Sequence, residues 1–525
     1  MTQIFTDNPH THALPHEAWR PHQRETLEWL AGTGRDVRLV EAPTGSGKTS
    51  FAAGLSTLEP VISLVRTRNL QQVNYGQTYG ARVLFGRGSY PCVHPDATSG
   101  MNGEDCYYEV AMTECKCADD CPYLIAKHKA QQSRFTSLNY SYYFAAKWPR
   151  KALARLVLDE AHQLSDIVLD HSGITLSQRE CERYDLSVPP SISPLLPGKA
   201  GRSLAERWLA EVDTVLSRAI SSCRMHDPQT LRRKRALSSL LLKVQSTRTS
   251  LEAAPDDWYI ASGQVNDAGT RAGMRFIARP LTARHVFPLH FADRQLVLMS
   301  ATMGDFGVVA AELGIGEFDS RRVPHQFSPV MRRVRVLDAP RMNWKSGDAE
   351  YRQQAKVIAS AVREAPSSWS GIIHTVSRVQ AQRLHGLLDR MLSGRMYLDR
   401  DDLPTEQSVA EWQQWRDYHG KRQSGQIVVS WRMGEGYDGL EERICILAKT
   451  PFPNTGDLYE KRRMDYDTRF YLQRTAWAVE QALGRTRRGR VQDYGDENGL
   501  VAVADGNWTR VRSFLSESFR EAILQ

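Results

Sequence analysis

The chain has 525 residues, of which 41% are hydrophobic and 24% are charged, a composition typical of a globular protein with roughly two to four domains. No apolar run reaches the roughly 18 residues of a membrane-spanning helix, and residues 1–7 lack the basic-then-apolar pattern of a signal peptide. We therefore expect a cytoplasmic protein with no membrane association. The net charge of +8 favours a polyanionic partner. Short β-branched runs alternate with helical stretches, which predicts an α/β fold.

A phosphate-binding loop is the first informative feature along the chain. The segment 41–49 reads EAPTGSGKT and lies between a β-branched run at 37–40 and a helical stretch at 50–55. In that strand–loop–helix order, backbone N–H groups can surround phosphates, Lys48 can reach the β- and γ-phosphates, and Thr49 can hold Mg²⁺. The small residues that let the loop close are Ala42, Gly45, Ser46 and Gly47. The segment predicts an ATP site; the alternative is a glycine-rich turn without a ligand.

Five of the eight cysteines lie close together in the sequence: Cys92, Cys106, Cys115, Cys117 and Cys121. A dense cluster in a chain without a secretory signal favours a metal site over disulfides. Four thiolates suit either a 4Fe–4S cluster or zinc, so one of the five is surplus. Counting cysteines alone favours zinc.

The segment 155–162 reads RLVLDEAH, an apolar strand that ends in two carboxylates. Beside a phosphate loop, Asp159 would hold Mg²⁺ and Glu160 would orient and deprotonate the attacking water. An isolated pair of this kind is more often a solvated strand end. After it, prolines at 189, 190, 194 and 197 interrupt the segment 163–254, and its remainder is a charged helical stretch. There the basic tract 232–235 would contact DNA phosphates or form a solvated helix face.

The last part of the chain adds a second set of strands and a pair of arginines. Residues 371–375, 426–430 and 500–505 predict strands. In 481–488, QALGRTRR, Arg485 and Arg488 are three residues apart and share a helix face. Such a pair can act as arginine fingers on the γ-phosphate, or it can form a basic surface. Gln23, upstream of the phosphate loop, could bind the adenine edge.

In their order along the chain, these stretches resemble superfamily 2 helicases, and they are most similar to the XPD/DinG group of iron–sulfur DNA helicases. The resemblance covers residues 20–488. The matching stretches are RPHQ at 20–23, EAPTGSGKT at 41–49, VRTRNLQ at 65–71, DEAH at 159–162, SAT at 300–302, EGYDG at 435–439, KTPF at 449–452 and QALGRTRR at 481–488.

The resemblance implies two RecA-like motor domains with ATP and Mg²⁺ between them. Lys48, Thr49 and Asp159 would face Arg485 and Arg488 across the cleft, with Gln481 also at the nucleotide. Its 4Fe–4S cluster would take Cys92, Cys106 and Cys121, with Cys115 or Cys117 as the fourth ligand. The residues that would hold single-stranded DNA are Thr67, Arg68, Glu435, Gly436 and Asp438. Travel would be 5′ to 3′, by a monomer acting on single-stranded and forked DNA.

We expect the first motor domain to be discontinuous, made of 1–91, 122–162 and 255–330. It would carry an iron–sulfur module at 92–121 and a mostly helical, arch-like insertion at 163–254, and the second motor domain would span 331–525. Other readings stay open from sequence. One is an ATP-driven translocase that is an accessory subunit of a defence or mobile-element complex, and another is a zinc-bearing RNA helicase.

Overall fold

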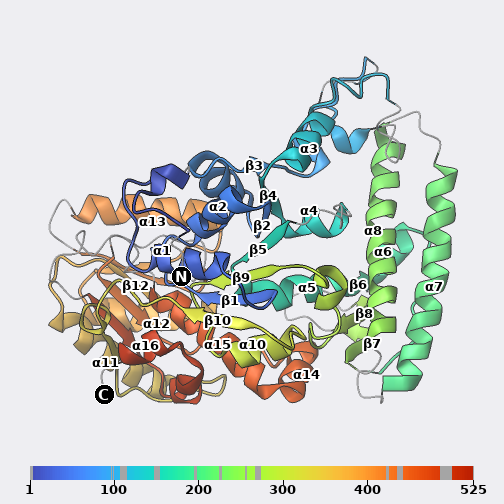
Figure 1. Ribbon diagram of the computed structural model, residues 1–525. Coiled ribbons are helices and arrows are strands. Elements are labelled where there is room, and N and C mark those ends of the chain that lie inside the picture. Colours follow the sequence, from blue (N-terminus) through green and yellow to red (C-terminus); the bar gives the residue numbers. More distant parts are fainter. Residues whose placement is uncertain are drawn as a thin grey trace.

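The computed structural model describes residues 4–12, 14–95, 97, 100–106, 115–146, 154–193, 198–223, 228–254, 257–265, 273–420, 425–433, 442–484 and 499–523. Its strands form one sheet of seven, one of six and one of three. The two larger sheets build two lobes, and two long helices stand beside them as a separate column (Figure 1). None of the described helices is both long and apolar enough to cross a membrane.

The first lobe is built on the seven-stranded sheet, in which every strand pair is parallel. Its order is β10 (Asp319–Arg322), β1 (Val37–Glu41), β9 (Leu296–Ser300), β5 (Arg155–Asp159), β2 (Val61–Val65), β4 (Phe135–Asn139) and β3 (Arg82–Val83). Alternate residues of the strands enter different cores, as Leu39 and Val40 do on β1. Both faces are therefore covered, which explains why these strands read as continuous apolar runs.

The helices of the first lobe follow its strands. They are α1 (Gln23–Ala31), α2 (Lys48–Leu58), α3 (Pro122–Gln132), α4 (Tyr140–Ala145), α5 (Leu164–Ser172), α9 (Phe287–Phe291) and α10 (Phe306–Glu312). Because the strands are parallel, their carboxyl ends share one edge, and the phosphate loop and the DEAH segment both leave the sheet there.

The second lobe repeats the design with six parallel strands. Their order is β11 (Val334–Val336), β16 (Leu500–Val503), β15 (Ile444–Leu447), β12 (Gly371–His374), β14 (Ile427–Ser430) and β13 (Met396–Leu398). The accompanying helices are α11 (Asp348–Glu364), α12 (Arg378–Met391), α13 (Thr405–Gly420), α14 (Leu458–Tyr466), α15 (Thr468–Leu483) and α16 (Glu517–Glu521). The α/β fold with two such lobes agrees with the sequence prediction.

The insertion combines helices with a small antiparallel sheet. Helices α7 (Gly198–Ser222) and α8 (Pro228–Ala253) share a core with β6 (Ile174–Ser177), β8 (Gly273–Pro280) and β7 (Trp258–Val265), beside the short helix α6 (Gln178–Arg183). The expected division placed residues 255–330 in the first motor domain. Strands β7 and β8 belong to this range, and in the structure they pack with the two long helices. We call α6–α8 and these three strands the arch.

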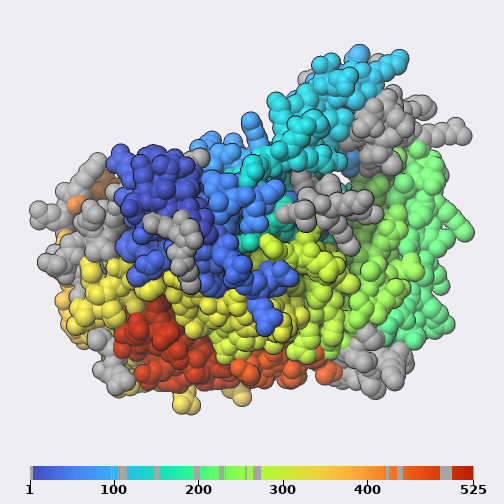
Figure 2. Space-filling view, viewed as in Figure 1, coloured from blue at the N-terminus to red at the C-terminus, as the bar shows by residue number. Residues whose placement is uncertain are grey.

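The basic tract of α8 faces the cysteine segment. Arg235 lies 3.9 Å from Glu104, and Arg233 lies 3.7 Å from Asp185. Figure 2 shows the part of the chain around α3 projecting from the body toward the arch helices. At least two of the four basic residues thus pair with carboxylates of the protein, an arrangement that neither sequence alternative included.

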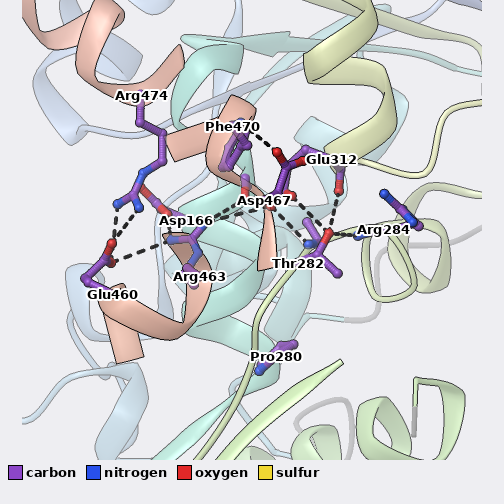
Figure 3. A network of polar contacts seen from close by, with 12 residues as sticks. Asp166, Pro280, Thr282, Arg284, Glu312, Glu460, Arg463, Asp467, Phe470 and Arg474 are labelled. Carbon is purple, nitrogen blue, oxygen red and sulfur yellow. Dashed lines mark hydrogen bonds and ion pairs between the residues drawn. The ribbon is translucent and has the colours of Figure 1, made fainter. Parts of the chain in front are cut away.

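A charge network around the buried Arg463 joins the two lobes (Figure 3). Arg463 of α14 is 5% exposed, and its guanidinium lies 2.7 Å from Asp166 of α5 and 3.7 Å from Glu312 of α10. Arg474 of α15 pairs with Glu460 at 2.7 Å and with Asp166 at 3.3 Å. Helices α14 and α15, though part of the second lobe in sequence, are thereby held against the first.

A candidate nucleotide site at the seam between the lobes

The phosphate loop has the backbone that its sequence predicted. It connects β1 to α2 and passes through left-handed conformations at Gly45 (φ +87°) and Gly47 (φ +85°), where a side chain would be strained. The Lys48 ammonium donates to the carbonyl of Ala42 at 3.2 Å, so it lies folded over the loop. Ser46 is 9% exposed, and its hydroxyl has no partner among the described residues. The loop therefore presents a cation and an unpaired hydroxyl to an anionic ligand.

The side chain of Gln23 packs against the phosphate loop and the start of α2. It is 1% exposed, and its amide Nε2 donates to the Ser50 hydroxyl at 2.6 Å. A Cβ added to Gly47 would lie 2.2 Å from that Nε2 atom and would displace the amide, in addition to the strain of the left-handed backbone. Arg20 donates to the carbonyl of Gly45. In this arrangement Gln23 contacts the loop and α2, and the side chain that was expected to bind adenine is engaged in holding the phosphate loop.

Asp159 ends β5 in a buried position, 3% exposed. The Tyr75 hydroxyl donates to its Oδ2 atom at 2.9 Å, and the backbone N–H of Glu160 donates to Oδ1 at 2.9 Å. Burial, followed by the charge of Glu160, raises the pKa of Asp159 to about 6, while Lys48 acts in the opposite direction. A carboxylate desolvated in this way gains strongly from a cation placed beside it, which suits a magnesium ligand.

His162 connects three parts of the site. It lies 3.3 Å from the Glu160 carboxylate and 2.8 Å from the Ser300 hydroxyl, and its other ring nitrogen contacts the Gln481 side chain. Glu160 itself has a left-handed backbone (φ +53°), an uncommon conformation for a residue other than glycine. The DEAH segment, the SAT segment and the last turn of α15 therefore meet at one histidine.

A cavity of about 100 Å³ lies beside this histidine cluster, between the lobes. Pro43, Thr44 and Thr302 line it from the first lobe, and Glu480 and Arg332 line it from the other side. The Thr302 hydroxyl is buried and has no partner among the described residues. The structure thus brings the predicted Lys48, Asp159, Glu160 and Gln481 to one seam, whereas Arg485 and Arg488 lie outside the described residues.

The residues expected to hold a nucleic acid are only partly described. Thr67 and Arg68 are exposed directly after β2, where the Thr67 hydroxyl accepts from the backbone of Leu70 at 3.3 Å and Arg68 lies over the ring of Phe85. Glu435, Gly436 and Asp438 lie outside the described residues. The exposed pair occupies the same sheet edge as the phosphate loop.

The five clustered cysteines do not form a metal site in the described part of the chain, where no three Cys, His, Asp or Glu side chains converge as ligands. Burial and the neighbouring Cys115, Asp120 and Cys92 raise the pKa of Cys117. The thiols of Cys92, Cys115 and Cys117 therefore lie near one another. Cys121 instead begins α3 and packs against the core of the first lobe. The donor chemistry suits a thiolate-bound group, but the described arrangement does not assemble four ligands.

No protein-family profile and no curated protein matches the sequence. Among solved structures, the fold is that of XPD helicases. One XPD helicase structure aligns over 93% of this chain and 95% of its own, with 15% identity and a TM-score of 0.54. An apo XPD structure aligns over 92% and 94%, with 14% identity and a TM-score of 0.50. The expected two-lobed, XPD-like architecture is therefore confirmed at the level of the fold.

Some residues of the site could not be found from the sequence. Tyr75 lies in the short helix Leu70–Thr78, four residues beyond the end of the VRTRNLQ stretch. Tyr140 is 3% exposed and donates to the carbonyl of Asp159 at 2.9 Å. Glu41 belongs to the phosphate-loop motif, but its acceptance of hydrogen bonds from Met303 and Gly304, at 2.8 and 2.7 Å, depends on tertiary structure.

Proposed function

We propose that this protein is an ATP-dependent DNA helicase that moves on single-stranded DNA, 5′ to 3′, and separates the duplex ahead of it. The observation that carries the proposal is the seam itself, where Lys48 and the buried Asp159 lie on one lobe and Gln481 reaches His162 from α15. ATP would be cleaved there with Mg²⁺ held by Thr49 and Asp159, while Arg485 and Arg488 would neutralise the transition-state charge. The XPD-like fold supports the same assignment.

In this mechanism Glu160 orients the attacking water and accepts its proton. Its carboxylate is 37% exposed and is held by His162 at 3.3 Å, so it is accessible from the seam and yet fixed in direction. Preorganisation of this kind is the main contribution a protein makes to phosphoryl transfer. Closure of the lobes on ATP and their opening after hydrolysis would then drive steps along the strand.

The path that we propose for the strand crosses the exposed ends of the parallel strands and the hollow beneath the arch. A cavity of about 790 Å³ lies between the first lobe and α8, lined by Arg66, Lys243, Phe144 and His171 among others. Cations and aromatic faces side by side suit phosphates and bases without sequence preference. Thr67, Arg68 and the segment with Glu435, Gly436 and Asp438 would hold the backbone.

We further propose that the cysteine segment binds a four-thiolate metal group, a 4Fe–4S cluster by resemblance, with Cys92, Cys106, Cys121 and either Cys115 or Cys117 as ligands. The support is the shared neighbourhood of Cys92, Cys115 and Cys117 and the thiol-only donor set. The group would stabilise the cysteine segment, which faces the arch. No step of ATP hydrolysis depends on the group.

The decisive experiment measures ATP hydrolysis with and without single-stranded DNA, beside strand displacement on a forked duplex. We expect hydrolysis that DNA stimulates and that Lys48→Ala abolishes, while Lys48→Ala still binds single strands. Glu160→Gln should bind ATP and fail to cleave it. RNA stimulation in place of DNA, or hydrolysis without displacement of any fork, would replace the helicase proposal by an RNA-dependent enzyme or an accessory translocase. Turnover by Lys48→Ala would refute the nucleotide site.

A further inference from the structure

The tripeptide Met303–Asp305, which follows the SAT segment, is held from both lobes at once. From the first lobe, Glu41 accepts hydrogen bonds from the N–H groups of Met303 and Gly304, at 2.8 and 2.7 Å. Glu41 directly precedes the phosphate loop, is 4% exposed, and also pairs with Arg322 at 3.4 Å. A displacement of the start of the phosphate loop would therefore also displace these two peptide groups.

From the other side, helix α15 reaches the same tripeptide. The indole N–H of Trp477 donates to the carbonyl of Met303 at 3.0 Å, and the Gln473 Oε1 atom accepts from the N–H of Asp305 at 3.0 Å. Both side chains are buried, at 5% and 0% exposure. Two further α15 residues, Arg469 and Gln481, contact Asp305 and His162.

These four α15 residues are spaced four apart, at 469, 473, 477 and 481, so they form one stripe along the helix. The stripe contacts Met303–Asp305 through its first three residues and the DEAH segment through its last two. Trp477 touches both, because its ring also lies edge-on to His162 at 5.9 Å. The remainder of α15 is anchored elsewhere, through Arg474 in the charge network of Figure 3.

Gly304 shows how closely the helix and the tripeptide fit. Its φ is +71°, and a Cβ at this position would lie 2.1 Å from Gln473 Nε2 and 2.6 Å from Gln473 Cδ. Any other residue would therefore be strained and would push Gln473 away. A second hydrogen bond holds the Gln473 side chain in place, because its Nε2 donates to the carbonyl of Phe514 at 3.1 Å. The contact is thus a rigid coupling and has little freedom to adapt.

We propose that Gln473 and Trp477 are positioning residues for ATP hydrolysis, which couple the phosphate loop, through Glu41 and Met303–Asp305, to the placement of α15 at His162, the residue that holds Glu160. The inference rests on the proposed ATPase function. It adds the contacts through which a movement of one lobe changes the position of the other. Neither residue lines the cavity at the seam, so their loss should lower turnover and leave ATP binding nearly unchanged.

The test uses two seam variants of the full chain. Trp477→Phe removes the indole donor and part of the fused ring but keeps an aromatic ring, a loss that its control below reproduces. Gln473→Met removes both hydrogen bonds of the amide in a side chain of similar length. We expect kcat for DNA-stimulated hydrolysis to fall about tenfold in each, with the Kd for a fluorescent ATP analogue within about twofold of wild type. This split between kcat and binding would not follow from a merely structural role.

Each seam variant has a matched control. Trp208 of the arch donates its indole N–H to the Ser187 hydroxyl at 3.0 Å, so Trp208→Phe loses the same kind of bond far from the seam. Gln354 is a fully buried amide in the second lobe that donates to the carbonyl of Ala504 at 2.7 Å, which makes Gln354→Met the partner of Gln473→Met. The controls should lower Tm as much as the seam variants and keep kcat within about twofold of wild type.

The outcomes separate the two proposals. If wild type hydrolyses ATP and the seam variants match their controls in kcat, the coupling route is wrong and the ATPase stands. If wild type hydrolyses no ATP under any condition, the proposed function fails, and the coupling fails with it. Should Gln473→Met not fold, Trp477→Phe decides alone, because it removes one hydrogen bond and little volume.

Discussion

The Tyr75 hydroxyl lies 2.9 Å from the Asp159 carboxylate and donates a hydrogen bond to it in the interior of the first lobe. Tyr75 is fully buried, and burial together with the charge of Asp159 raises its own pKa well above the ordinary value. It is therefore a permanent donor. Its bond favours the ionised form of Asp159, the form that a magnesium ion requires.

The first prediction concerns the acid limb of the pH–rate profile. Because the pKa of Asp159 is about 6, kcat/KM should rise with pH through that value at limiting Mg²⁺. Tyr75→Phe removes a donor to the charged form, so the limb should move to higher pH by about one unit. An unchanged limb would show that another group titrates. Tyr79→Phe, outside this contact, serves as the control.

The second prediction uses Glu480, which is 4% exposed and accepts hydrogen bonds from the backbone and hydroxyl of Ser516. Burial, and then the charge of Glu41, raises its pKa to about 8 from an ordinary 4.5. The folded state thus favours the protonated acid. The stabilisation from Glu480 is fully present below about pH 4.5 and is lost as the pH rises through 8.

Glu480→Gln should therefore match wild type in its free energy of unfolding near pH 5 and exceed it at pH 9, by on the order of 2–4 kcal/mol. Denaturant unfolding at several pH values measures the difference. Glu364→Gln, at a carboxylate that is 56% exposed, should show no such trend. A constant difference across the pH range would mean that Glu480 does not titrate there.

The third prediction tests the charge network between the lobes. Burial works against ionisation of Asp166, but Arg463 and Arg474 hold its pKa below the usual range. Arg463→Met would leave Asp166 and the buried Glu312 without their central cation, so it should cost about 3–5 kcal/mol of the free energy of unfolding. Arg383→Met breaks a surface pair whose arginine is 45% exposed, and it should cost less than about 1 kcal/mol. Equal costs would contradict the account.

The fourth prediction concerns the cysteine segment. Protein purified without oxygen should be brown and carry iron, and Cys121→Ser should lose both the colour and the iron while retaining some DNA binding. Comparing Cys115→Ser with Cys117→Ser identifies the fourth ligand, since only one of them should lose the metal. A colourless protein that carries zinc would replace the iron–sulfur proposal. Cys181→Ser, in the arch core, is the matched control.

The features that the sequence predicted well are those that depend on residues close together in the chain. A phosphate loop is a strand, a turn and a helix start within a dozen or so residues, so Lys48 and its neighbours could be placed from spacing alone. Asp159 and Glu160 follow in the same way from an apolar strand and its end.

Contacts between distant segments could not be read in the same way. The pairing of β8 with β6 and β7 decides that Phe276 joins the arch core, although the segment reads as an ordinary amphipathic strand. Trp477 and Gln473 have no motif of their own, and their role depends on a turn more than 160 residues earlier in the chain. For Gln23 the sequence predicted contact with adenine, and it could not show that Ser50 would engage its amide.

The strand order of the first lobe also constrains how the chain is made. Strand β1 pairs with β9 and β10, which begin at Leu296 and Asp319. During synthesis, about 260 further residues must follow β1 before the first of these neighbours, β9, is complete and can pair with it. Until then the apolar β1 is an unprotected edge, so we expect the nascent chain to need a chaperone more than the finished protein does.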